Sequence, residues 1–328
     1  MATLTTEPEV RSKKHLTFSQ GLKLLGPYVV PAVVFSSGVF AFFTPVLFIL
    51  LGKRGRPQQI LTALATNSLV LYGMGQIRMI PVFLLFTTFF SIGTLTLVEL
   101  AAKRKTWTDG GLLTFITGLW LALTLLGGSI LCQILFRQGL LASLGHFWLE
   151  MSKDVPLQVK QEWFGDVSEA EFILQLPYQV TSALVSISIF TSWLCLQTAT
   201  ALSPIRRELS RKIGFKVSDF FLIPTMLLWA WALFETQIRA MGLAWVPSVH
   251  TGRVFGVVLQ GFASLYFLQG LTVFGQILAQ YNVPRFFRMI LALAVIMLML
   301  PTFAFIGGLD ALIDLRKRLA PKGATKID

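Results

Sequence analysis

Long stretches without charge dominate the pattern of hydrophobic and polar positions along this chain. Pro81 to Val98, for example, reads PVFLLFTTFFSIGTLTLV and carries no charged residue. A helix needs about 20 predominantly apolar residues to cross a bilayer. Stretches of this kind lie at 27–51, 59–77, 80–99, 111–136, 177–202, 219–236, 254–280 and 286–308. The pattern predicts an integral membrane protein with about seven or eight transmembrane segments.

These segments have the pattern of helices and not of barrel strands. The run Leu112 to Phe136 lacks the regular alternation of polar and apolar residues that a barrel strand shows. A helix also satisfies its backbone hydrogen bonds within the segment, which a lipid environment requires. We therefore expect an all-α polytopic bundle.

The charges strengthen this interpretation and argue against nucleic acid as a partner. Charged residues make up only 13% of the 328 residues, hydrophobic residues 54%, and the formal net charge is +12. Basic residues gather beside the apolar stretches, as the positive-inside rule predicts for cytoplasmic loops. The clusters are 11–23, 53–56, 103–105, 206–216 and 316–326. We expect the lipid bilayer to be the partner of this charge.

Loop charge divides the chain into five parts. We predict a basic cytoplasmic segment 1–26, a first bundle 27–136, an extracytoplasmic connector 137–176, a second bundle 177–308 and a basic tail 309–328. The connector is acidic and has amphipathic stretches, which either cover a cavity or lie among lipid headgroups.

The charge rule fails at both ends if 27–51 and 286–308 each cross the membrane once. Pro31, Ser36, Gly38 and Pro45 interrupt the first stretch. One explanation is a broken or re-entrant first segment, whose irregular backbone needs protein or water around it. The other is that the rule does not hold at the termini.

The chain carries no recognisable catalytic motif. It has no phosphate-binding loop, no nucleophile elbow and no zinc-binding helix. The three histidines are far apart in sequence, and Cys132 and Cys195 lie inside apolar runs. We therefore expect a protein that is not an enzyme, with no catalytic residue, no metal site and no cofactor.

Polar side chains inside the apolar stretches are the candidate ligand-binding residues, because burying them in a bilayer costs free energy. Helical spacing places Tyr266, Gln269, Gln276 and Gln280 on one face of the seventh stretch. The alternative for this face is hydrogen bonding between helices, worth about 0.6 kcal/mol per contact. The remaining candidates are Asn67 and Glu235; Glu235 either binds a cationic ligand or forms an interfacial ion pair with Arg239.

Two charged segments are candidate docking sites for a protein partner. They are the basic linker with Arg206 and Arg207, and the tail with Asp310, Asp314 and Arg316. Asp310 and Asp314 lie one turn apart on a helix, but no third group accompanies them as a catalytic pair would require. We therefore interpret these two segments as docking sites and not as catalytic sites.

The order of features resembles the YybS-like family of bacterial membrane proteins. The resemblance rests on Pro45 with the following KRG, the acidic spacer ending at Leu176, the linker RRELSRKIG, YFLQGLTVF at 266–274 and GGLDALIDLRKR at 307–318. That family is grouped with the substrate-binding S components of energy-coupling-factor transporters. The resemblance implies an S-component-like bundle with additional C-terminal spans, in a bacterial cytoplasmic membrane.

The function that follows is binding of a small molecule or lipid by a transporter-like subunit, with a separate subunit supplying the energy. The absence of a phosphate loop agrees with this division of labour. The alternative is a membrane scaffold that recruits partners through its linker and tail and transports nothing. An intramembrane enzyme is a third class, which the shortage of nucleophile and base pairs disfavours.

Overall fold

The computed structural model describes the helical parts of the chain. The described residues are 18–38, 40–54, 57–104, 108–139, 142–143, 149–150, 169–203, 215–241, 249–284, 286–288, 290–291, 294 and 300–315. Throughout these ranges the secondary structure is helical and contains no strand, so the predicted all-α class is confirmed. The chain forms two compact units, Met1–Thr88 and Phe89–Asp328.

Five helices among the described residues are long and apolar enough to cross a membrane. They are Ile77–Lys103, Asp109–Ile134, Ile173–Leu202, Asp219–Ala240 and Thr251–Leu278. Each overlaps a stretch predicted from hydropathy, which indicates a multi-pass membrane protein. The predicted total of seven or eight segments stays a prediction.

The other three predicted stretches form shorter helices or lie partly outside the described residues. The stretch 59–77 corresponds to α3 (Pro57–Gly73), which has 17 residues. The stretch 27–51 contains parts of two helices, α1 (Phe18–Ser36) and α2 (Thr44–Arg54). The last stretch, 286–308, is described only in part and runs into α14 (Leu300–Ile313).

The first unit contains α1, α2, α3 and α4 (Ile80–Thr88), with short 3₁₀ turns η1 (Ala41–Phe43) and η2 (Ile77–Met79). The break between α1 and α2 follows Ser36, where Gly38 takes a φ of +67°. Only glycine adopts such a backbone freely, so the helix ends there. Whether this helix pair re-enters the membrane stays a prediction.

The core of the first unit is built around aromatic rings and one buried amide. Phe83 packs against Phe35 at a ring-centroid distance of 5.2 Å and against Phe48 at 6.2 Å. Asn67 on α3 is fully buried and accepts a hydrogen bond of 2.8 Å from the backbone N–H of Ala32 on α1. Its own amide donates to the carbonyl of Ala63 at 2.7 Å.

The bond from Ala32 to Asn67 lies directly after Pro31 in α1. A proline within a helix disturbs the local hydrogen-bond ladder, and buried polar groups are stable only when they are hydrogen-bonded. Asn67 supplies an acceptor to this part of α1 from a neighbouring helix. Asn67 therefore has a structural role between α1 and α3, as the packing alternative for buried polar residues describes.

Replacing Asn67 tests this role. Asn67→Ala removes a buried amide and its hydrogen bonds to Ala32 and Ala63, and should destabilise the protein by about 2 kcal/mol. Thr66→Ala is the matched control, because the Thr66 hydroxyl bonds only within its own helix on an exposed face. Thermal unfolding in detergent measures both variants, and equal melting temperatures for the two would contradict this role.

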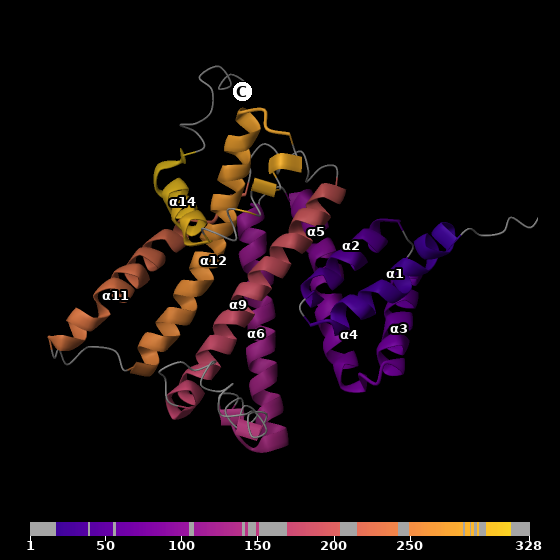
Figure 1. Cartoon of the computed structure of the whole chain (residues 1–328), viewed down its shortest axis with the longest axis horizontal. Helices are drawn as coiled ribbons and strands as arrows, with labels where there is room; N and C mark the ends of the chain where they lie inside the picture. Colours follow the sequence, from indigo (N-terminus) through magenta and orange to yellow (C-terminus); the bar gives the residue numbers. More distant parts are fainter. Residues whose placement is uncertain are drawn as a thin grey trace, which may run out of the picture. The chain divides into compact units, whose positions relative to one another are not determined.

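The second unit continues with α-helices of 11 to 34 residues and with short turns between some of them. After the π-helical turn η3 (Phe89–Gly93) come α5 (Thr94–Arg104), α6 (Asp109–Phe136) and α9 (Glu169–Leu202). The turn η4 (Asp219–Phe221), α11 (Leu222–Ala240), α12 (Val249–Gln280) and α14 follow. Helix α12 packs on α9, α11 and α14, and α9 packs on α6, as the side-by-side ribbons show (Figure 1).

Helices α12 and α14 run antiparallel in close contact. Phe303 near the start of α14 packs on Phe274, whereas Gly307 lies against Tyr266, earlier in α12. A Cβ atom at Gly270 would collide with the Phe303 carbonyl, and one at Gly307 with the Tyr266 carbonyl. Small residues permit such close backbone approach between helices in membranes.

Alanine at these glycines should separate the two helices. We expect Gly270→Ala and Gly307→Ala each to lower stability by about 3 kcal/mol, because backbone atoms cannot move aside as a side chain can. Gly275→Ala and Gly308→Ala are the controls, since a Cβ atom there meets nothing within 4 Å. Melting temperatures in detergent should fall only for the first pair, and a comparable fall in the controls would show that the close contact is not the cause.

Candidate functional site

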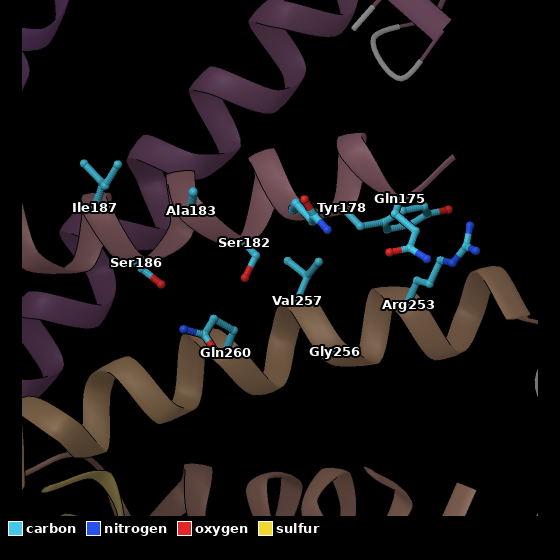
Figure 2. Close-up of a pocket in the computed structure, with 11 residues that line it drawn as sticks. Gln175, Tyr178, Ser182, Ala183, Ser186, Ile187, Arg253, Gly256, Val257 and Gln260 are labelled. Carbon is cyan, nitrogen blue, oxygen red and sulfur yellow. The ribbon is translucent and has the colours of Figure 1, made fainter. Parts of the chain in front are cut away.

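A cleft with a partly polar lining lies between α9 and α12 in the second unit. Its volume is about 800 Å³, within the range of small-molecule sites. Figure 2 shows side chains of the two helices facing one another across it. Its lining consists of Gln175, Tyr178, Gln179, Ser182, Ala183, Ser186, Ile187, Arg253, Gly256, Val257 and Gln260.

Helix α9 presents its polar side chains to the cleft in steps of three and four residues. Gln175, Tyr178, Ser182 and Ser186 follow this spacing, which places them on one face of a helix. Pro177 lies inside α9. A proline disturbs the hydrogen-bond ladder of the preceding turn, so backbone carbonyls there become available to other donors.

Arg253 donates to a backbone carbonyl in the turn before Pro177. Its Nη1 donates to the carbonyl oxygen of Leu174 at 3.3 Å, and its guanidinium lies 5.7 Å from the ring centre of Tyr178. These two contacts hold the start of α12 beside the start of α9. Among the described residues no carboxylate pairs with Arg253, so its charge and the remaining N–H groups are open to the cleft.

The opposite end of the cleft is closed by direct contact between the helices. The hydroxyl groups of Ser186 and Ser264 meet at 3.0 Å. Nearby, a Cβ atom at Gly261 would come within 3.1 Å of Val185. The cleft therefore lies between two points at which α9 and α12 touch, one at Arg253 and the other at Ser186.

The chemistry of the lining favours an anionic or strongly polar ligand. Arg253 is the only charged residue in the lining, and a guanidinium binds carboxylate and phosphate groups through parallel N–H donors. The glutamine amides and serine hydroxyls add both donors and acceptors. Among the described residues no group of three histidine, cysteine or acidic side chains lies close enough together to hold a metal ion.

Gln269, a predicted ligand-binding residue, lies instead within the packing of the second unit. It is fully buried, its Oε1 accepts from the backbone N–H of Val217 at 2.9 Å, and its Nε2 donates to Asp310 at 2.7 Å. Asp310 is 1% exposed. One side chain thus joins α12, α14 and the segment before α11, which we call the Gln269 junction.

Lys216 adds charge contacts beside the Gln269 junction. Its ammonium lies 3.1 Å from Asp219 and 3.3 Å from Asp314. Burial lowers the pKa of Lys216, but hydrogen bonds and charge attraction from Asp219 and Asp314 outweigh it and raise the pKa above its usual value. The stabilisation is present below the ordinary lysine pKa and is lost as pH rises through the raised value.

The other predicted ligand-binding residues do not gather in one site. Tyr266 is buried and lines a separate apolar cavity among α11, α12 and α14, whereas Gln276 and Gln280 are exposed. Glu235 pairs with Arg239 at 2.8 Å, which is the ion-pair alternative for this residue. Asn67 belongs to the first unit.

Of the predicted docking residues, Asp310 and Asp314 make the internal contacts above. A carboxylate that is 1% exposed does not form a docking surface without rearrangement of α14. Arg206, Arg207 and Arg316 lie outside the described residues, as does most of the connector 137–176. Docking through these segments stays a prediction.

Substitutions at the Gln269 junction test whether it is structural. Gln269→Leu leaves the Val217 N–H and the Asp310 carboxylate without this partner and should destabilise the protein by about 3 kcal/mol. Gln269→Glu should also destabilise it, because two carboxylates then face one another. Combining Gln269→Glu with Asp310→Asn exchanges the two groups and should recover much of the loss in melting temperature. No recovery would contradict a direct pairing.

The sequence did contain a signal for the cleft. Gln175, Ser182 and Ser186 form a polar face on α9, and Arg253 and Gln260 form another on α12. Neither Arg253 nor Gln260 is among the residues that the sequence predicts to bind a ligand. What the sequence does not reveal is that these two faces, more than 60 residues apart along the chain, lie opposite one another.

Comparison of the chain with protein-family models, with curated proteins and with solved structures gives no match. The resemblance to the YybS-like family therefore stays a prediction.

Proposed function

We propose that this chain is a non-enzymatic, ligand-binding membrane protein whose site is the cleft between α9 and α12. The ligand carries an oxyanion group, carboxylate or phosphate, which binds Arg253. The observation that carries this proposal is a guanidinium without a described carboxylate partner, facing a cleft of about 800 Å³ lined by amides and hydroxyls.

The position of Arg253 supports a binding role. It lies within the candidate span Thr251–Leu278, near its first residues. A charged side chain in such a segment is costly and normally faces a protein interior or a water-filled cavity. Leu174 and Tyr178 hold the guanidinium toward the cleft. An incoming anion would complete its hydrogen bonding.

The charge pattern suggests which side the ligand enters from. The Arg253 end of α12 lies beside the start of α9, which follows the acidic connector. The basic linker follows the other end of α9. At the end of this linker, the backbone of Lys216 lies against Gly110 at the start of α6. By the positive-inside rule the Arg253 end of the cleft lies on the extracytoplasmic side, and the membrane we propose is the bacterial cytoplasmic membrane.

Partner subunits belong to this proposal. The chain has no phosphate-binding loop, so a protein that moves its ligand across the membrane would need a separate energising subunit. This division between a ligand-binding protein and a separate energising subunit is the one expected for an S-component-like protein. The scaffold alternative has less support, because Asp310 and Asp314 are engaged in contacts within the second unit.

Native mass spectrometry of the protein extracted from its own membrane tests the proposal. We expect a discrete small-molecule adduct on the wild-type chain. Arg253→Gln should weaken its retention by about 10- to 100-fold, the value of a hydrogen bond to a charged group. Gly256→Phe should remove the adduct by filling the cleft, because a Cβ atom at Gly256 meets nothing within 4 Å.

Gly275→Phe is the matched control for Gly256→Phe. It lies on the same helix, its Cβ atom also meets nothing within 4 Å, and it does not line the cleft. The control should retain the adduct. An adduct that survives both Arg253→Gln and Gly256→Phe would place the ligand elsewhere and overturn the proposal.

A further inference from the structure

A second cavity adjoins the α9–α12 cleft. It encloses about 500 Å³ among α6, α9 and α12. We call it the α6 cavity, since Gly118, Leu121 and Leu125 of α6 form one of its walls. Tyr178 and Val257 line both the cleft and the α6 cavity. The cleft and the α6 cavity are therefore neighbours on either side of these two side chains, and a molecule that occupies both must pass between Tyr178 and Val257.

The α6 cavity is suited to hydrocarbon. Most of its remaining lining is apolar, including Val185, Ile189, Val254, Val258, Phe262 and Leu265. The three threonine hydroxyls in its lining all donate hydrogen bonds elsewhere. Thr114 donates to the Gly110 carbonyl, Thr117 to Ser192 and Thr181 to the Pro177 carbonyl. The cavity thus presents no threonine O–H donor to a ligand.

We infer that the ligand is an amphiphile, with its oxyanion head group beside Arg253 and a hydrocarbon tail in the α6 cavity. This inference rests on the proposed function and names the class of ligand. The cleft and the cavity match the two ends of such a molecule: a cation with amides and hydroxyls on one side of Tyr178, apolar side chains on the other.

The two ends contribute differently to binding. Lipid tails are as apolar as the cavity walls, so moving a tail from the bilayer into the cavity gives little hydrophobic driving force. The head group therefore supplies most of the affinity through Arg253. The cavity selects which tail fits but adds little to the affinity. An experiment that locates the tail therefore tests the inference better than a measurement of affinity does.

A photo-crosslinking experiment locates the tail. The full chain is placed in phosphatidylcholine nanodiscs with a long-chain alkyl phosphate that carries a diazirine near the end of its tail. We expect crosslinks on α6 around Leu121 and Leu125, mapped by peptide mass spectrometry. The corresponding alkyl carboxylate distinguishes the two oxyanions, and the alkyl alcohol, which has no charge, should give at least tenfold less labelling there.

Two glycines of α6 provide a matched pair of variants. A Cβ atom meets nothing within 4 Å at either Gly118 or Gly127, but only Gly118 lines the cavity. Gly118→Phe should lower labelling of α6 by about tenfold or more, while Gly127→Phe leaves it unchanged. Gly118→Leu replaces the phenylalanine variant if that protein does not assemble.

The outcomes separate this inference from the proposed function. Labelling confined to α9 and α12 near Arg253, lost in Arg253→Gln but unaffected by Gly118→Phe, would overturn the tail assignment and leave the proposed site intact. Labelling that neither Arg253→Gln nor Gly256→Phe reduces would overturn both. Labelling of Leu121 and Leu125 no stronger than that of exposed residues such as Ile130 and Ile134, and unchanged in every variant, would also overturn the tail assignment.

Discussion

The absence of water from the core of a bilayer is the constraint on which this structure depends. Polar groups in apolar helices must find partners within the protein. In the first unit Asn67 meets this demand by accepting from Ala32. In the second, Gln269 joins the Val217 backbone and Asp310. Gln269 and Asp310 lie on α12 and α14, the two helices whose close contact Gly270 and Gly307 allow.

Helix α12 carries two polar regions with different environments. Around Gln269 the polar groups are paired and buried, and they connect helices. Around Arg253 and Gln260 the polar side chains line a cleft, and the guanidinium has bonding capacity beyond its contact with Leu174. The difference follows from packing: α14 covers the first region closely, whereas α9 meets α12 at Ser186 and Ser264 and leaves space beyond them. That space is what makes ligand binding the function we propose.

Much of the fold could be predicted from hydropathy, because a helix in lipid satisfies its backbone locally and length alone marks the span. The five long apolar helices match predicted stretches, and α1 ends close to the predicted interruption at Ser36 to Gly38. The site could not be predicted in the same way. Spacing placed Gln269 with Tyr266, Gln276 and Gln280 on one face, but α14 buries Gln269 while Gln276 and Gln280 stay exposed. Which polar face of a helix is buried depends on which other helices pack against it. A single amino-acid sequence gives little information on such packing between helices that are far apart along the chain.

The most direct test of a ligand site in the α9–α12 cleft is a cryo-electron microscopy structure of the full chain in nanodiscs of its native lipids, with an antibody fragment added for size. The account predicts density in the cleft that does not belong to the polypeptide, with one end within hydrogen-bonding distance of the Arg253 guanidinium. A cleft closed by direct packing of α9 on α12, or an Arg253 side chain paired with a carboxylate of the chain itself, would contradict it.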